Sequence, residues 1–233
     1  MKKLIASLIV VTSLFTITSC SNEEPVPQAY PDTYIIAKQS GETVLYGLGM
    51  YTYSNTDMKS VVAQGPDDQE YTLGAYGGYL YQYYWETDDA DFSESLPETG
   101  DYSFNVVFKN GDTQTVNETL TSTVLSPAVF TTCEWETDNN QISLAWDVVT
   151  GTDYSVILMR DSEGTVVWLS SALGSTVASG DINASSGWVN GNAPVNGDTY
   201  TIELSIFKYD TGTKSYIQAK AVTTQNIVWG GSN

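Results

Sequence analysis

The amino-acid sequence predicts an all-β protein built from two tandem β-sandwich domains. Short runs rich in Val, Ile, Thr and Tyr alternate between apolar and polar residues, and clusters of Gly, Asn, Asp and Pro separate the runs. This is the pattern of an all-β sandwich or barrel, and no segment shows a helical period. Two sets of sequence features also recur at an offset of roughly 100 residues, which is the length of one sandwich domain.

In the first half of the chain, alternation and turn residues define the strands. Asn110-Gly111 lies between two alternating runs, and both residue types tolerate the positive φ angles of a tight hairpin turn. Gly65-Pro66-Asp67-Asp68 has the composition of a second turn. We therefore expect strands over residues 33–38, 43–53, 59–64, 70–75, 79–86, 101–109 and 113–124.

The second half repeats this plan after a boundary at Leu125-Ser126-Pro127, so we expect domains over residues 29–127 and 128–233. The expected strands cover residues 131–136, 141–147, 153–161, 165–170, 175–177, 187–189, 200–209 and 216–224. Alternation places one set of side chains in the core, namely Ile142, Leu144, Trp146, Tyr154, Val156, Leu158, Tyr200, Ile202, Leu204 and Ile206.

The repeat is visible in two pairs of segments. Ser60-Val61-Val62-Ala63, an acidic turn and an apolar strand correspond to Ser155-Val156-Ile157-Leu158 with its own acidic turn and strand. Residues 97–104 and 194–202 share a proline, a Gly-Asp pair and a tyrosine. The two halves therefore look like copies of one domain.

The second half resembles a fibronectin type III domain, one of the immunoglobulin-like sandwiches. The resemblance rests on Leu144-Ala145-Trp146, Tyr154-Ser155-Val156 and the segment Gly197–Leu204. It implies a tryptophan on the second strand, a tyrosine on the third and a tyrosine corner at Tyr200.

The first half resembles the same family less completely. Leu96-Pro97 and Tyr102 are similar to a tyrosine corner, in which the hydroxyl group bonds the backbone just upstream. The second strand has no tryptophan, and Tyr46 or Leu48 would take its place.

The N-terminus predicts an export signal. Met1-Lys2-Lys3 is positively charged and residues 4–16 carry no charge, a stretch too short to span a membrane but typical of a signal peptide. Ile17-Thr18-Ser19-Cys20 resembles the bacterial lipoprotein box. That resemblance implies that residues 1–19 are removed and that Cys20 is acylated, and two or more acyl chains give a stable membrane anchor.

Residues 20–28 are expected to form a flexible tether, because they are polar, acidic and interrupted by proline. Ser21, Glu23 and Glu24 resemble the export tag of Bacteroides-type surface lipoproteins. We therefore expect the protein at the outer membrane and on the cell surface, with the periplasmic face as the alternative.

Composition excludes several classes of function. Removing residues 1–19 takes away Lys2 and Lys3 and leaves 7 basic and 28 acidic side chains, a net charge of −21 that disfavours nucleic acid as a partner. The sequence has no histidine, which excludes Ser-His-Asp and Cys-His catalysis and histidine-ligated zinc. We expect no enzyme activity and no cofactor, and Cys133 is interpreted as a small buried residue.

Tyrosine is concentrated in the first domain, where residues 30–102 contain most of the 16 tyrosines. On a strand over 79–86, Tyr79, Tyr81, Tyr83 and Trp85 share one face, which either belongs to the core or stacks against sugar rings. Asp88 and Asp91 follow and would accept hydrogen bonds from sugar hydroxyls. They lack the glycine and distal glutamate of a calcium loop, so no metal site is expected.

The sequence therefore predicts a non-catalytic binding accessory, with a glycan as its expected ligand. The alternative is a structural or protein-docking subunit of an envelope or uptake assembly. The expected partners are the membrane, through the lipid anchor, and either a glycan or an envelope protein.

Overall fold

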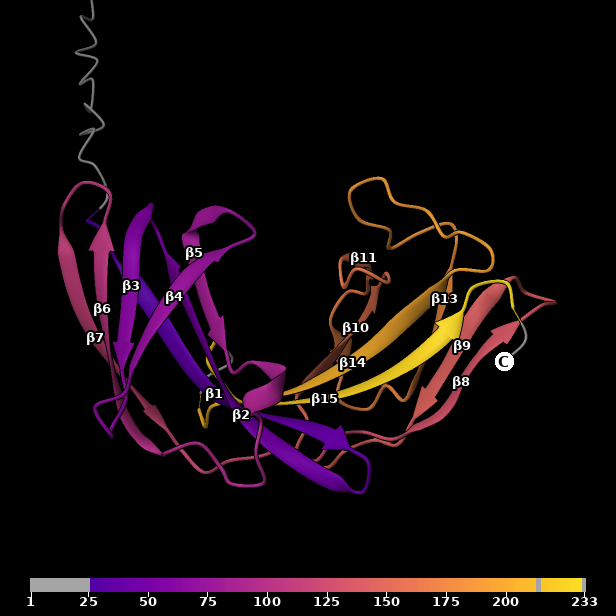
Figure 1. The fold of residues 1–233 in the computed structure, drawn as a ribbon, viewed down its shortest axis with the longest axis horizontal. Coiled ribbons are helices and arrows are strands. Elements are labelled where there is room, and N and C mark those ends of the chain that lie inside the picture. The colour runs from indigo at the N-terminus through magenta and orange to yellow at the C-terminus, as the bar shows by residue number, and fades with distance from the viewer. Residues whose placement is uncertain (1–25, 213–214, 232–233) are drawn as a thin grey trace, which may run out of the picture.

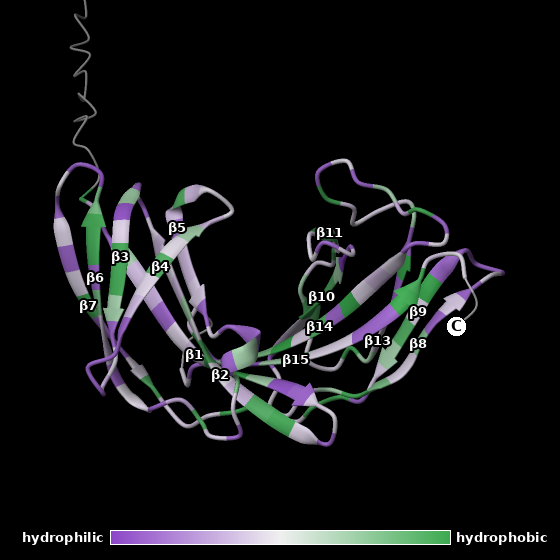
Figure 2. Ribbon diagram, viewed as in Figure 1, coloured by the Kyte–Doolittle hydropathy of each residue, from purple (hydrophilic) through white to green (hydrophobic). Residues whose placement is uncertain are grey.

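The computed structural model describes residues 26–212 and 215–231 of the chain. In this part of the chain the regular elements are strands β1 to β15 and a single 3₁₀ turn at Asp89–Asp91. Hydrophobic and hydrophilic residues alternate along many of the strands (Figure 2), as they must when one face of each strand is buried. The predicted all-β sandwich class is confirmed.

The first sandwich is formed by the first seven strands. One layer contains β1, β2 and β5, and the other contains β4, β3, β6 and β7. β4 joins the layers, because residues 70–73 pair with β3 and residues 74–76 pair with β5. The bounds are β1 Ala29–Ser40, β2 Thr43–Ser54, β3 Met58–Gln64, β4 Glu70–Tyr76, β5 Tyr79–Glu86, β6 Gly100–Phe108 and β7 Thr113–Leu120.

The second sandwich repeats this plan. Its smaller layer has the order β13-β9-β8, and its larger layer has the order β11-β10-β14-β15, with β12 paired to β10. The bounds are β8 Phe130–Glu136, β9 Gln141–Trp146, β10 Tyr154–Arg160, β11 Val166–Leu169, β12 Leu173–Gly174, β13 Ser179–Asn183, β14 Thr199–Tyr209 and β15 Ile217–Val228. The order β11-β10-β14-β15 reproduces β4-β3-β6-β7, which agrees with the repeat in the sequence.

The two sandwiches share one continuous sheet. Residues Ile35–Lys38 of β1 pair in parallel with Ala219–Val222 of β15, while the other edge of β1 pairs with β2 along its whole length. The shared sheet therefore runs β11-β10-β14-β15-β1-β2-β5-β4 and continues into β3, β6 and β7. Figure 1 shows the two sandwiches as two arms that meet where β1 and β2 lie beside β15.

Each sandwich has its own apolar core. Met58, Phe104 and Phe108 are among the buried residues of the first core, and Trp146 and Ile202 are among those of the second. Full burial of such a side chain stabilises a fold by roughly 1.5–3 kcal/mol.

Both expected tyrosine corners are present. The Tyr102 hydroxyl donates to the Glu98 carbonyl oxygen at 2.7 Å, and the Tyr200 hydroxyl accepts from the Val195 N–H at 3.1 Å. Of the two residues expected in the tryptophan place of the first sandwich, Leu48 is buried in the core and Tyr46 is half-buried, and the choice between them stays a prediction.

The predicted inward face of β10 is wrong. Ile157 and Met159 enter the core of the second sandwich, while Tyr154, Val156 and Leu158 lie on the opposite face of the strand. Both faces of β10 carry apolar residues, because the outer face lines a cleft between the sandwiches, and alternation alone does not distinguish two apolar faces.

Two short strand predictions are also wrong. Residues 175–177 form a turn, and the strand that follows them is β13, where only Ile182 is buried. Residues 187–189 make a single bridge, between Trp188 and Trp168, and no strand. β13 is a mostly polar edge strand, so it has little apolar alternation to reveal it.

The chain passes from the first sandwich to the second through residues 121–129, which include the predicted boundary at Leu125-Ser126-Pro127. The division at residue 127 stays a prediction, because β1 belongs to a ladder in each half. The predicted signal peptide, Cys20 and most of the tether lie outside the described residues. None of the described helical residues forms a segment that is long and apolar enough to cross a membrane.

Candidate functional site

The aromatic residues predicted on β5 divide between core and surface. Tyr83 is 6% exposed, and its hydroxyl donates to the Met58 carbonyl oxygen at 3.2 Å. Trp85 is half-buried and packs edge-on against the ring of Tyr71 at 4.7 Å. Tyr79 and Tyr81, at the start of the strand, are exposed. Of the two alternatives for this face, burial in the core therefore applies to Tyr83 and Trp85, and exposure at the surface applies to Tyr79 and Tyr81.

The predicted acids after β5 are on the surface. Asp88 precedes the 3₁₀ turn, Asp91 is its last residue, and both are exposed. Within residues 26–212 and 215–231, no group of three or more His, Cys, Asp or Glu side chains is placed to hold a metal ion. A ligand-binding role for Tyr79, Tyr81, Asp88 and Asp91 stays a prediction.

A larger site lies on the opposite face of β5, between the two sandwiches. There the shared sheet bends into a cleft with a volume of about 710 Å³. Ligand pockets in proteins are typically concave sites of 300–1,000 Å³ with apolar and aromatic linings. We call this site the cleft, and its aromatic lining residues are Tyr34, Tyr51, Tyr76, Tyr84, Tyr154 and Phe207.

The wall from the first sandwich is built on paired strands. Tyr51 of β2 and Tyr84 of β5 are direct cross-strand partners, so their side chains share the cleft face. The ring of Tyr76 meets the ring of Tyr84 edge to face at 5.7 Å.

Glycine makes room for a tyrosine at the base of this wall. Tyr34 is opposite Gly49 in the β1–β2 ladder, and a Cβ atom on Gly49 would lie 2.4 Å from the Tyr34 ring. The Tyr34 ring can therefore lie flat over the strand, where it is almost completely buried. Gly49 thus has a packing role.

The wall from the second sandwich is built on β10 and β14. Tyr154 and Phe207 are cross-strand partners, and their rings stack at 4.6 Å with an interplanar angle of 8°. Val156 and Leu158 extend this apolar surface toward β11. Burial raises the pKa of the Tyr154 hydroxyl well above its ordinary value, so this group stays a neutral donor and acceptor across the physiological pH range.

The cleft also contains paired charges. Arg160 Nε lies 3.0 Å from Glu203 Oε2, and the Ser205 hydroxyl donates to the other Glu203 oxygen at 2.9 Å. On the opposite wall, Glu86 forms ion pairs with Lys38 at 3.3 Å and Lys220 at 3.9 Å. Glu86 is only half-buried and is suited to accept a hydrogen bond from a ligand. Glu203 is buried with both oxygens already bonded, so its role is to orient Arg160.

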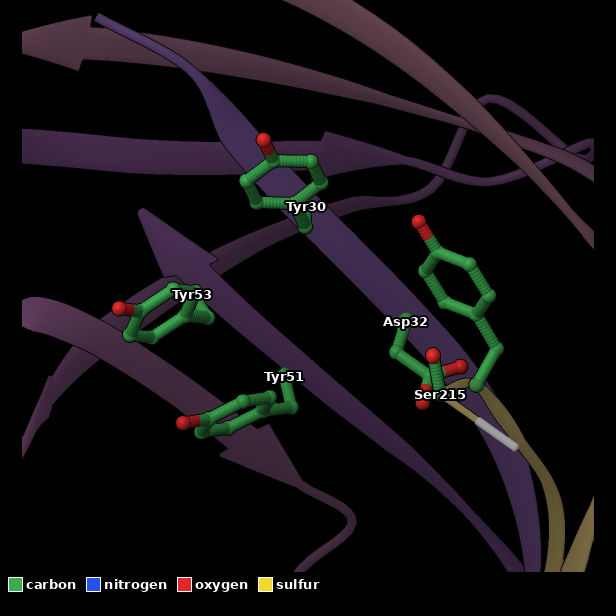
Figure 3. A pocket seen from close by; sticks show the side chains of 6 residues that line it. Tyr30, Asp32, Tyr51, Tyr53 and Ser215 are labelled. Atoms are coloured by element: carbon green, nitrogen blue, oxygen red, sulfur yellow. The ribbon is translucent and has the colours of Figure 1, made fainter. Parts of the chain in front are cut away.

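Beside the cleft lies a smaller hollow of about 470 Å³, which we call the cup. It is lined by Tyr30, Asp32, Tyr51, Tyr53, Ser215 and Tyr216. Figure 3 shows the rings of Tyr30, Tyr51 and Tyr53 to one side of Asp32 and Ser215. Asp32 and Tyr51 line both the cup and the cleft, so the two hollows adjoin.

Asp32 is a buried carboxyl group with one satisfied oxygen. It is 6% exposed, and Oδ2 accepts the Ile217 N–H at 2.7 Å. Oδ1 has no hydrogen-bond partner among the described residues. Burial raises the pKa of Asp32 to about 8, the negative charges of Glu118 and Asp210 add to the rise, and the N–H groups of Ile217 and Thr33 oppose it.

The sequence contained one correct signal for this site, which is the excess of tyrosine in the first half of the chain. It indicated an aromatic surface but assigned it to Tyr79, Tyr81, Tyr83 and Trp85. The alternate residues of the same region, Tyr76 and Tyr84, line the cleft instead.

Comparison with known proteins finds no family model that matches the chain and no curated protein that is similar to it. Solved structures with a similar arrangement include a segment of two fibronectin type III domains from chicken tenascin. It is 9% identical, covers 85% of this chain and 100% of the tenascin segment, and has a TM-score of 0.30.

A cytokine receptor complex is 8% identical over 86% of this chain and 98% of that chain, with a TM-score of 0.31. A tetra-tandem repeat from the extending region of a large adhesion protein is 16% identical, covers 86% of this chain and 49% of that chain, and has a TM-score of 0.28. The sandwich assignment given above rests on the strand order and the cores of this protein itself.

Proposed function

We propose that this protein is a non-catalytic glycan-binding accessory of the bacterial cell surface and that its binding site is the cleft. One observation carries the proposal: aromatic side chains from both sandwiches line a single cleft of about 710 Å³ over a shared sheet. A site assembled from two domains on a continuous sheet is preorganised, which reduces the free-energy cost of ordering it around a ligand.

The chemistry of the lining suits sugars. The exposed faces of Tyr76, Tyr84 and Phe207 offer flat apolar surfaces to the C–H face of a sugar ring, and tyrosine adds a hydroxyl group at its edge. Glu86 can accept hydrogen bonds from sugar hydroxyls, and Arg160, which Glu203 orients, can donate them. Since both glutamates are held in ion pairs, the cleft is equipped to orient hydroxyl groups, and we assign it binding without turnover.

The location is part of the same proposal and rests on the sequence. Ile17-Thr18-Ser19-Cys20 supplies a lipid anchor at Cys20 that holds the sandwiches at the outer membrane, on the cell surface. The periplasmic face is the alternative location. Mass spectrometry of the membrane-extracted protein should show acyl chains on Cys20, and an unmodified thiol would remove the anchor from the proposal.

The test is binding of the purified protein to a panel of polysaccharides, followed by two matched variants. Tyr76 and Tyr79 are direct partners in the β4–β5 hairpin and each is 55% exposed, but only Tyr76 lines the cleft. We expect Tyr76→Ala to weaken glycan binding about tenfold, by analogy with nucleic-acid bases, whose stacking on an aromatic ring is worth about 1–3 kcal/mol. Tyr79→Ala should change it less than twofold.

The reverse result would restore the surface predicted from the sequence, at Tyr79 and Tyr81, as the binding site. Trp85→Ala is a poor test of binding, since Trp85 packs against the first core and its loss should destabilise the fold. If no polysaccharide binds and a stoichiometric protein partner copurifies from membranes, the alternative of a docking subunit replaces this proposal.

A further inference from the structure

The cup combines aromatic rings with a buried carboxyl group. Tyr30 and Tyr53 are cross-strand partners whose rings lie 6.5 Å apart at an interplanar angle of 23°. Tyr51 lies beside them, opposite Asp32 in the ladder (Figure 3). Tyr216, the residue before β15, also lines the cup. Tyrosine faces attract cations through the ring quadrupole, and sites of this composition recognise ammonium groups.

Asp32 supplies the second half of such a site. Its Oδ1 has no donor among the described residues, and a buried acceptor without a donor is costly. No ion pair to Asp32, Glu118 or Asp210 occurs in residues 26–212 and 215–231. Glu118 and Asp210 therefore place negative charge near the cup, and the carboxyl group at its centre has one oxygen without a donor.

These features select among cations. A quaternary ammonium group has no N–H and leaves Oδ1 unsatisfied, whereas a primary ammonium group donates three hydrogen bonds. Calcium needs six to eight oxygen ligands, and the cup offers one carboxylate. A protonated primary amine is thus the class of ligand that satisfies both the rings and the carboxyl group.

We propose that the cup binds a protonated primary amine, and that this amine is the free amino group of an amino sugar in the glycan held by the cleft. The identification of this amine as part of a glycan rests on the function proposed above. The position of the cup favours this source, because Asp32 and Tyr51 line cup and cleft alike, so a single glycan can extend from the cleft into the cup.

Binding of the amine requires a small movement at Asp32 and the loss of the Asp32 carboxyl proton. Oδ1 is covered in the unliganded structure, so the carboxyl group turns or the backbone at Ser215 and Tyr216 moves to meet the amine. The groups facing Asp32 are Glu118 of β7, Asp210 after β14, and the tyrosines Tyr34, Tyr51, Tyr154 and Tyr216. Burial and the negative charges of Glu118 and Asp210 raise the pKa of Asp32 to about 8, so an amine bound at pH 7 displaces the carboxyl proton.

The main experiment compares two oligosaccharides of equal length, one of glucosamine and one of N-acetylglucosamine, binding to the protein at pH 6.5. We expect at least tenfold tighter binding of the glucosamine oligomer. Asp32→Asn should abolish this preference, and Asp138→Asn, which removes an exposed charge from the β8–β9 turn, should preserve it. Equal affinities, or an equal loss in both variants, would overturn the proposal.

A second arm uses propylamine, which stays protonated to about pH 10 as lysine does. Its addition should shift the amide resonance of Ile217, which is bonded to Asp32, and its affinity should rise as the pH increases from 6 to 8. Should Asp32→Asn fail to fold, Tyr53→Ala provides the test, since Tyr53 is exposed, with Tyr79→Ala as its control.

The two arms separate the two proposals. Glycan binding without preference for the amino sugar leaves the proposed function standing and overturns the amine site. An Asp32-dependent response to propylamine without any oligosaccharide binding supports the amine site and overturns both the glycan function and the amino-sugar source. Binding of a lysine-containing peptide in place of the amino sugar also overturns that source.

Discussion

Asp32 combines burial with a carboxyl group, and this combination makes the stability of the protein depend on pH. Its pKa of about 8 lies far above the ordinary value of 3.8, so the folded protein holds a proton that the unfolded chain releases near pH 4. The free energy of unfolding therefore falls as the pH rises from 4 to 8, and this contribution levels off above pH 8.

Asp32→Asn should remove that dependence. We expect the variant to gain stability relative to the natural protein by about 1 kcal/mol per pH unit between pH 5 and 8, since one pKa unit corresponds to about 1.4 kcal/mol. Urea unfolding at several pH values measures the difference. Asp138→Asn, at an exposed position, should show no such trend, and a constant difference between Asp32→Asn and the natural protein would contradict the buried, protonated carboxyl group.

At the residue scale, the sequence predicts where the tyrosine-rich strand lies better than it predicts which face of the sheet each side chain occupies. The tyrosine-rich strand over 79–86 is found with the expected bounds. Tyr83 enters the core and Tyr84 the cleft, because the partner strand β2 carries Thr52 on its core face and Tyr51 on its cleft face. A strand with aromatic residues on both faces has no local signal for which face is inside.

At the scale of elements, β10 has two apolar faces with different roles. Met159 is fully buried in the second core, and its neighbour Leu158 lies half-buried in the wall of the cleft. We expect Met159→Ala to lower the free energy of unfolding by about 2–4 kcal/mol and Leu158→Ala by about 1 kcal/mol or less, because only the first leaves a closed cavity. The urea unfolding midpoints of the two variants measure these losses of stability. A larger loss for Leu158→Ala than for Met159→Ala would contradict this assignment and support the inward face predicted from the sequence.

Two strands of the second sandwich show which kind of strand the alternation of apolar and polar residues predicts and which kind it misses. Apolar and polar residues alternate over residues 200–206 of β14, and the predicted core residues Tyr200, Ile202, Leu204 and Ile206 are confirmed. β13 was missed because it is an edge strand whose only fully buried residue is Ile182. Edge strands are often short and polar, which protects the sheet from pairing with other chains.

At the scale of the whole molecule, the main finding absent from the sequence is the parallel pairing of β1 with β15. Ile35–Lys38 and Ala219–Val222 both have the pattern of ordinary strands, and nothing in either segment indicates a partner from the other half of the chain. The repeat correctly predicted similar sandwiches. The pairing of β1 with β15 joins the two sandwiches, and without it the two walls of the cleft would not face each other across one sheet.

Amide hydrogen exchange of β1 tests this joint, and with it the existence of the cleft, most directly. Between Ile35 and Lys38, β1 has β2 on one side and β15 on the other, so successive amides are bonded alternately to the two neighbours. We expect every amide in this segment to exchange slowly, at rates set by opening of the whole sheet. Fast exchange of alternate amides would show that this edge of β1 is open in solution, and it would contradict the shared sheet on which the cleft depends.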